Sequence, residues 1–118
     1  MKACSIKNLA TRACVPCHGG VQRLRGVALR NLRKGLGRGW TAVKTHHLEK
    51  EFGFKDFKSA LAFTNRVGAL AEKQGHHPDM YLAWGRVRIL LWTHAVGGVT
   101  ENDFVLAARI ERVKRIDA

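Results

Sequence analysis

The sequence has few of the features that define membrane, disulfide-bonded or fibrous proteins. Its longest apolar run, Val87 to Val96, is interrupted by Arg88 and His94, and it is far shorter than the roughly 20 residues that a membrane-spanning helix needs. Three cysteines are an odd number, which does not close a disulfide framework. A length of 118 residues suits one hydrophobic core. We therefore expect one folded domain, no membrane span and reduced thiols in the cytoplasm.

Acidic residues are absent from the first 40 positions, which hold nine of the 21 Lys and Arg side chains. The rest of the chain holds 12 basic and nine acidic side chains, so the net charge of +12 comes mainly from the N-terminal part. We expect residues 1–22 to form an irregular basic arm and residues 23–118 to form the domain. A solvated tail, a polyanion-binding arm and a mitochondrial targeting sequence are the interpretations left open, because such targeting sequences are rich in Arg and poor in acid.

The arm contains Cys14 and Cys17 at the spacing of a zinc or redox pair. A structural zinc ion normally takes four ligands, and only Cys4 and His18 lie nearby in the sequence. A redox pair of this type belongs at a strand-to-helix junction, which the following glycines do not indicate. We predict neither a metal nor a redox site there.

Helical and strand-like patterns alternate along the domain. Apolar spacing predicts helices over 24–36, from Asp56 as N-cap to a stop at Gly75, and from a capping box that begins at Thr100. Strand-forming segments are expected over 40–45, 48–54, 80–84 and 87–93, joined in pairs as hairpins. The order α-β-β-α-β-β-α predicts an α+β fold, with a four-stranded antiparallel sheet and three helices packed on one face.

Three histidines stand out as candidates for chemistry. His76 and His77 precede Pro78, which favours an extended backbone, and adjacent side chains on an extended chain diverge. The two imidazoles are therefore expected to have different tasks. His94 ends the fourth predicted strand, at the edge of the sheet, where functional groups on a rigid scaffold are common.

Two carboxylates lie near these histidines in the sequence. Glu72 is one helical turn before His76, close enough to reach the same cavity, and Asp103 is in the first turn of the last helix. Each has a simpler interpretation. Asp103 could do no more than cap a helix, and Glu72 could be a solvated side chain without a function.

The aromatic side chains and the remaining histidines are expected to be structural. We expect the aromatic rings of Trp84, Trp92 and Phe104 to lie in the core. The pair His46-His47 is expected in a hairpin turn without a function. No histidines are spaced i, i+4 on a helix, so no catalytic metal is predicted.

An ordered set of motifs resembles the signature of the pterin-4a-carbinolamine dehydratases. The set comprises Glu72-x-x-x-His76-His77-Pro78 and Thr93-His94-x-x-x-Gly98-x-Thr100-x-x-Asp103. The likeness extends from about Trp40 to the C-terminus, although Gly75 stands where some members have Asp or Asn. The resemblance implies a small α+β enzyme that assembles as a homodimer or homotetramer and needs no metal or other cofactor.

The implied reaction dehydrates 4a-hydroxytetrahydrobiopterin to the quinonoid dihydropterin, for recycling of tetrahydrobiopterin. By this similarity His77 and His94 transfer protons and His76 places the substrate. Glu72, Pro78 and Asp103 bind the substrate or orient the imidazoles or the pterin ring. The alternatives are a non-enzymatic dimerisation cofactor of a transcription factor, a role of animal relatives, and a nucleic-acid binder that uses the basic arm. The resemblance favours the pterin as the partner over nucleic acid.

Overall fold

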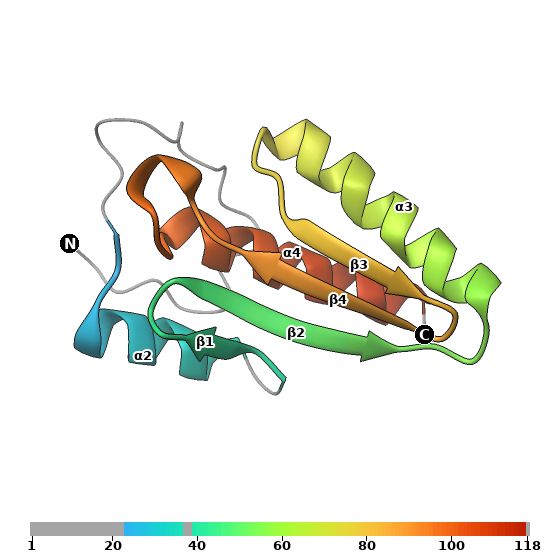
Figure 1. The fold of residues 1–118 in the computed structure, drawn as a ribbon, viewed down its shortest axis with the longest axis horizontal. Coiled ribbons are helices and arrows are strands. Elements are labelled where there is room, and N and C mark those ends of the chain that lie inside the picture. The colour runs from blue at the N-terminus through green and yellow to red at the C-terminus, as the bar shows by residue number, and fades with distance from the viewer. Residues whose placement is uncertain (1–22, 37–38, 118) are drawn as a thin grey trace.

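The computed structural model describes residues 23–36 and 39–117, which form an antiparallel sheet with helices (Figure 1). The elements in chain order are α2 (Gly26–Gly35), β1 (Thr41–Val43), β2 (His47–Gly53), α3 (Phe57–Gln74), β3 (Asp79–Ala83), β4 (Arg86–Leu91), the 3-10 turn η1 (His94–Val96) and α4 (Glu101–Asp117). The predicted α+β class and the order α-β-β-α-β-β-α are confirmed. The predicted arm, residues 1–22, lies outside the described residues.

The strands lie in the order β1-β2-β4-β3, and each neighbouring pair is antiparallel. In the central pair, Leu48 faces Leu91 and Phe52 faces Val87. Because side chains alternate between the two faces of a sheet, these four point to one side, and all four are buried. Figure 1 shows α4 passing behind β4 and β3. The helices therefore cover the apolar face of the sheet.

Helix α3 packs against α4 and β3 through an apolar stripe. Ala60, Phe63, Val67 and Ala71 recur at helical spacing, and all are buried, as the periodicity predicts. The centroid of the Phe63 ring lies 5.0 Å from that of Phe52 on the sheet. Phe63 therefore joins the helix layer to the sheet layer at the centre of the core.

The residues that end α3 set the position of the segment that follows it. Asp56 is the N-cap, and its carboxylate accepts a hydrogen bond from the Ser59 backbone N–H at 2.8 Å. Hydrogen bonds from the side chain and then the backbone of Ser59 lower the pKa of Asp56 below its ordinary value. At the other end Gly75 is left-handed, with φ 67° and ψ 26°, a conformation that glycine adopts without strain. The His76 N–H then bonds to the Ala71 carbonyl at 3.2 Å, which fixes the start of the histidine loop.

Both hairpin turns lie within two residues of their predicted places. The first has Lys44 and Thr45 in the left-handed region, with φ of 50° and 57°, and His47 already belongs to β2. The second turn is formed by Trp84 and Gly85. The prediction that Trp84 lies in the core is wrong, because this turn directs the indole away from the packed face and leaves Trp84 74% exposed.

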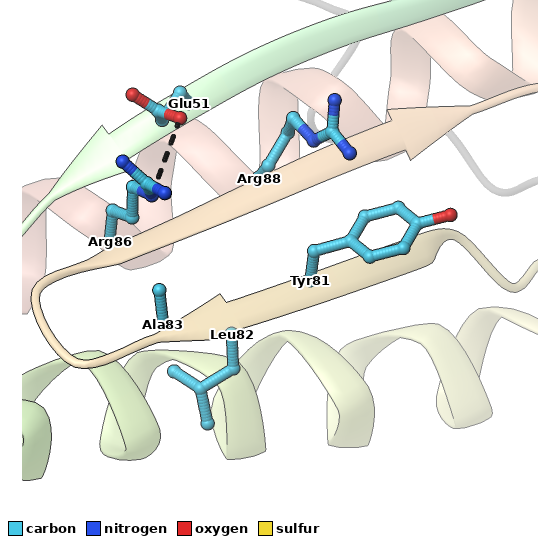
Figure 2. A pocket seen from close by; sticks show the side chains of 6 residues that line it. All are labelled: Glu51, Tyr81, Leu82, Ala83, Arg86 and Arg88. Atoms are coloured by element: carbon cyan, nitrogen blue, oxygen red, sulfur yellow. Dashed lines mark ion pairs between the residues drawn. The ribbon is translucent and has the colours of Figure 1, made fainter.

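The other face of the sheet is polar and open. Figure 2 shows Glu51 and Arg86 paired on neighbouring strands, with Arg88 and Tyr81 beside them. Arg86 Nε lies 3.9 Å from Glu51 Oε1, and the Arg88 guanidinium lies 4.7 Å from the centroid of the Tyr81 ring. These side chains border a shallow hollow of about 390 Å³. Its charged lining contrasts with the apolar face that the helices cover.

Replacing Phe63 with alanine should lower the free energy of unfolding by about 3–5 kcal/mol, because the change leaves a cavity in the core. Phe57→Ala is the matched control, since it removes the same group from the same helix at a residue that is 49% exposed. The control should change stability by no more than about 1 kcal/mol. Urea unfolding followed by circular dichroism measures both values. Equal losses in the two variants would contradict the central position of Phe63.

Candidate active site

A buried pair of side chains connects the histidine loop to the last helix. His76 is only 5% exposed, and its Nε2 lies 2.6 Å from Asp103 Oδ1. The second carboxylate oxygen of Asp103 accepts hydrogen bonds from the Thr93 hydroxyl at 2.9 Å and from the Thr100 backbone N–H at 2.8 Å. Both oxygens of the buried Asp103 are therefore hydrogen-bonded, as burial of a carboxylate requires. Asp103 caps α4, as its simpler interpretation expected, and also binds the His76 ring.

The loop that contains His94 is held by the same group of residues. Thr93 pairs with Gly98 across the loop, and the Thr93 and Thr100 hydroxyl oxygens are 2.7 Å apart. This short bridge closes the segment containing η1, which begins at His94. The loop after β4 and the loop before β3 are thus fixed to one point at the start of α4.

His77 lies in a more open position than its neighbour. Its ring and the Glu72 carboxylate are both exposed, and His77 Nε2 is hydrogen-bonded to Glu72 Oε2. Glu72 was expected to reach a cavity shared with His76. Instead its carboxylate pairs with His77, five residues further along the chain, because the reversal at Gly75 brings that ring back beside the helix end.

The third histidine contacts an aromatic ring. The centroid of the His94 ring lies 4.0 Å from that of Trp92, and the centroid of the His46 ring lies 4.4 Å from that of Trp92. The indole N–H of Trp92 points to Asp79 Oδ2 at 3.3 Å. Trp92 therefore lies beside the candidate site and is half-buried.

The three predicted histidines line one hollow of about 240 Å³. Its lining consists of Gly75, His76, His77, Trp92, His94 and Ala95. Glu72 and Asp103 do not line the hollow but bond to two of the imidazoles that do. Pro78 is half-buried next to the lining residue His77. The arrangement brings three imidazoles to one small cavity, two of them hydrogen-bonded to carboxylates.

Sequence reasoning missed two residues of this region. Trp92 is half-buried and not in the core, and its ring contacts that of His46, expected only in a hairpin turn, next to the hollow. One signal could have found Trp92, because it is two residues from His94 and positions two apart share a face on an extended chain. The contact with His46 bridges 46 positions of sequence (92 − 46), and no local pattern predicts it.

The zinc and redox interpretations of Cys14 and Cys17, with Cys4 and His18, lie outside the described residues. Within residues 23–36 and 39–117, no three His, Cys, Asp or Glu side chains are grouped so that they could hold a metal ion. In the same residues, no helix is long and apolar enough to cross a membrane.

Comparison with known proteins defines the class to which this fold and sequence belong. The model of the family described as pterin 4 alpha carbinolamine dehydratase matches residues 22–113. A putative pterin-4-alpha-carbinolamine dehydratase of Alkaliphilus metalliredigens is 47% identical over 91% of this chain and 96% of its own. One of Rubrobacter xylanophilus is 49% identical over 92% of this chain and all of its own.

A solved structure agrees with these relatives. The crystal structure of a transcriptional coactivator/pterin dehydratase from Brucella melitensis superposes with a TM-score of 0.73 at 33% identity, covering 78% of this chain and 98% of the other. The chain belongs to the pterin 4 alpha carbinolamine dehydratase family. It is an enzyme of the hydro-lyase class.

Asp103→Ala should lower the free energy of unfolding by at least about 2 kcal/mol, because it removes the buried carboxylate that bonds the His76 ring, the Thr93 hydroxyl and the Thr100 N–H. The control Glu51→Ala removes a carboxylate whose nearest cation is 3.9 Å away on the open face, so its effect should stay below about 1 kcal/mol. Chemical denaturation at neutral pH gives both values. If Asp103→Ala were as stable as the control, the connecting role of this carboxylate would be refuted.

Proposed function

We propose that this protein dehydrates a pterin-4a-carbinolamine such as 4a-hydroxytetrahydrobiopterin, and that its histidines supply the protons. The family gives the reaction class, and the observation that supports the histidine mechanism is the single hollow lined by His76, His77 and His94. In the reaction the C4a–O bond breaks, the hydroxyl takes a proton and leaves as water, and N5 loses its proton as the N5=C4a double bond forms. One proton is delivered and one is removed, so the enzyme needs no redox step.

Imidazole suits both proton transfers. An unperturbed histidine titrates at about pH 6.5, so its acid and base forms coexist near neutral pH. The proposal gives the two proton transfers to His77 and His94, the more exposed rings of the hollow, and gives substrate placement to His76. The buried bond from His76 to Asp103 makes it the least mobile of the three.

The carboxylate partners support this division. A neutral His77 that donates from Nε2 to Glu72 leaves Nδ1 with its lone pair, available to a substrate proton. The same bond orients the ring, as a carboxylate does in many catalytic histidine pairs. Asp103 would hold His76 in one tautomer in the same way. Pro78 would keep the backbone of the loop extended, so that the adjacent imidazoles diverge.

The name of the Brucella melitensis relative supports a second role, as a transcriptional coactivator. Such a role would use a surface of the protein and not the proton chemistry of the hollow. Binding to a partner that survived His77→Ala unchanged would identify this role as separate. The compartment stays a prediction, cytoplasmic or, through residues 1–22, mitochondrial.

We also infer that the protein self-associates, as a homodimer or homotetramer. β3 is an edge strand, and Tyr81 and Leu82 on it are 53% and 36% exposed. A free strand edge with large exposed apolar side chains favours pairing with another strand. A second copy of this chain offers the same edge, and an isologous contact of that kind closes without further growth.

The activity test uses synthetic 4a-hydroxytetrahydropterin, mixed with protein and followed by absorbance. The protein should accelerate loss of water over the buffer rate, with and without a chelator. His77→Ala and His94→Ala should each lower kcat by about 100-fold or more, the usual contribution of a positioned acid or base. Glu51→Ala, in β2 and outside the lining of the hollow, is the control and should keep the full rate. Near-normal turnover in either histidine variant would refute the assigned roles.

The association test is light scattering after size-exclusion chromatography. The 13.2 kDa chain should elute at twice or four times its mass, and Leu82→Lys should shift it toward the monomer by placing a charge at the strand edge. Val27→Lys on α2, at a residue 61% exposed, is the control and should leave the mass unchanged. A wild-type protein that is monomeric at micromolar concentration would contradict the inference.

A further inference from the structure

The three histidines of the hollow are not held in the same way. The rings of His76 and His77 each bond to a carboxylate, Asp103 and Glu72 respectively. The His94 ring makes no hydrogen bond to any residue in the part of the chain that the structure describes, and its ring contact is with Trp92. His94 is also exposed and lies in a short 3-10 turn. A proton-transfer group in such a position needs something else to fix the direction of its ring.

Trp92 has the contacts to do this. Its ring centroid lies 4.0 Å from that of His94 at an interplanar angle of 42°. Its N–H is directed to the carboxylate of Asp79 at 3.3 Å, at the start of β3. Asp79 directly follows the loop of His77, so the indole is tied to the same loop that supplies the other histidines. A large side chain held at its polar end offers a fixed surface for a neighbouring ring.

A second support for Trp92 comes from the turn between β1 and β2. The His46 ring lies 4.4 Å from the indole at 38°. Its Nδ1 lies 3.1 Å from His47 Nδ1, and His47 Nε2 lies 3.2 Å from Glu49 Oε1. These contacts connect Glu49 on β2 through the His47 and His46 rings to the Trp92 indole. The His46 ring is therefore oriented by its neighbours.

We propose that Trp92 is a positioning residue for His94, and that His46 supports Trp92 from the β1–β2 turn. The proposal rests on the proposed function, because it matters only if His94 exchanges a proton with the substrate. It assigns to an indole the orienting task that carboxylates perform for the other two imidazoles. It also makes the β1–β2 turn part of the active-site structure, although that turn does not line the hollow.

A purely structural role for Trp92 predicts different measurements. If the indole only filled space, its removal would lower stability and leave the turnover of the folded enzyme unchanged. If it orients His94, removal lowers kcat in protein that remains folded. KM should change less than kcat, because the other residues that line the hollow also bind the substrate. The comparison of kcat with KM, together with a spectroscopic signal from His94, separates the two roles.

The kinetic test uses four variants. Trp92→Leu should lower kcat by about tenfold and Trp92→Phe by no more than about threefold, since a ring contact of this type accounts for about one order of magnitude in rate. His46→Ala should lower kcat by about threefold, and His46→Phe should restore it, because an aromatic ring can replace the contact. KM should stay within about twofold throughout, as expected when an interaction acts mainly in the transition state.

A matched control removes an exposed ring far from the hollow. Phe57 begins α3, and Glu72 lies 15 positions further along the same helix (72 − 57), a distance of about 22 Å at 1.5 Å per residue. Phe57→Ala should therefore keep the wild-type kcat and KM.

The spectroscopic test needs no turnover. The ring protons of His94, assigned by comparison with His94→Gln, should be shifted upfield by the indole in the wild type. They should return to the positions of a solvated histidine in Trp92→Leu and remain shifted in Phe57→Ala. Thermal melts check that each variant is folded, and if Trp92→Leu fails to fold, His46→Ala and Trp92→Phe give the decisive rates.

The outcomes separate this inference from the function on which it rests. An active wild type with full kcat in folded Trp92→Leu, or in His46→Ala if the former does not fold, would overturn the inference and leave the dehydratase function intact. Unchanged His94 ring signals in Trp92→Leu would overturn it as well. An inactive wild type would refute the proposed function, and the inference with it. A kcat loss that follows loss of the indole, with rescue by an aromatic ring, supports the positioning role.

Discussion

The hydrogen bond between buried His76 and buried Asp103 is the contact on which the geometry of the site depends. It joins the loop that precedes β3 to the first turn of α4, and through Thr93 and Thr100 it also fixes the loop that follows β4. Breaking a buried pair by removing one partner is far more costly than breaking an exposed one. One carboxylate thus determines where two separate histidine loops lie relative to each other.

The fold explains why the histidines can meet at all. Antiparallel pairing of β3 with β4 brings the start of one strand beside the end of the other, with Asp79 opposite Leu90. The histidine loop enters β3 at that end of the sheet, and His94 leaves β4 at the same end. Loops at the edge of a rigid sheet can hold reactive groups in place while remaining open to a ligand. The apolar core supplies the rigidity, and the polar groups meet where the packing stops.

Local sequence signals predicted the elements well, because their causes are local. They also singled out three histidines that line one hollow, while the roles of these histidines stay a prediction. The cap at Asp56, the left-handed stop at Gly75 and the apolar stripe of α3 each depend on residues a few positions apart. The contact of Trp92 with His46 and the pairing of Glu72 with His77 could not be predicted in this way. They depend on a chain reversal and on a ring contact between separate elements. Trp84 was misplaced because a shift of one residue in a turn moves a side chain from the core to solvent.

The central claim is that His76, His77 and His94 surround one ligand. The most direct measurement is a titration of protein containing ¹⁵N-labelled histidine with a stable dihydropterin, followed by the ring resonances of each imidazole. The account predicts that the signals of all three histidines move together and give one dissociation constant. A response confined to one of the three, or different constants for each, would contradict it.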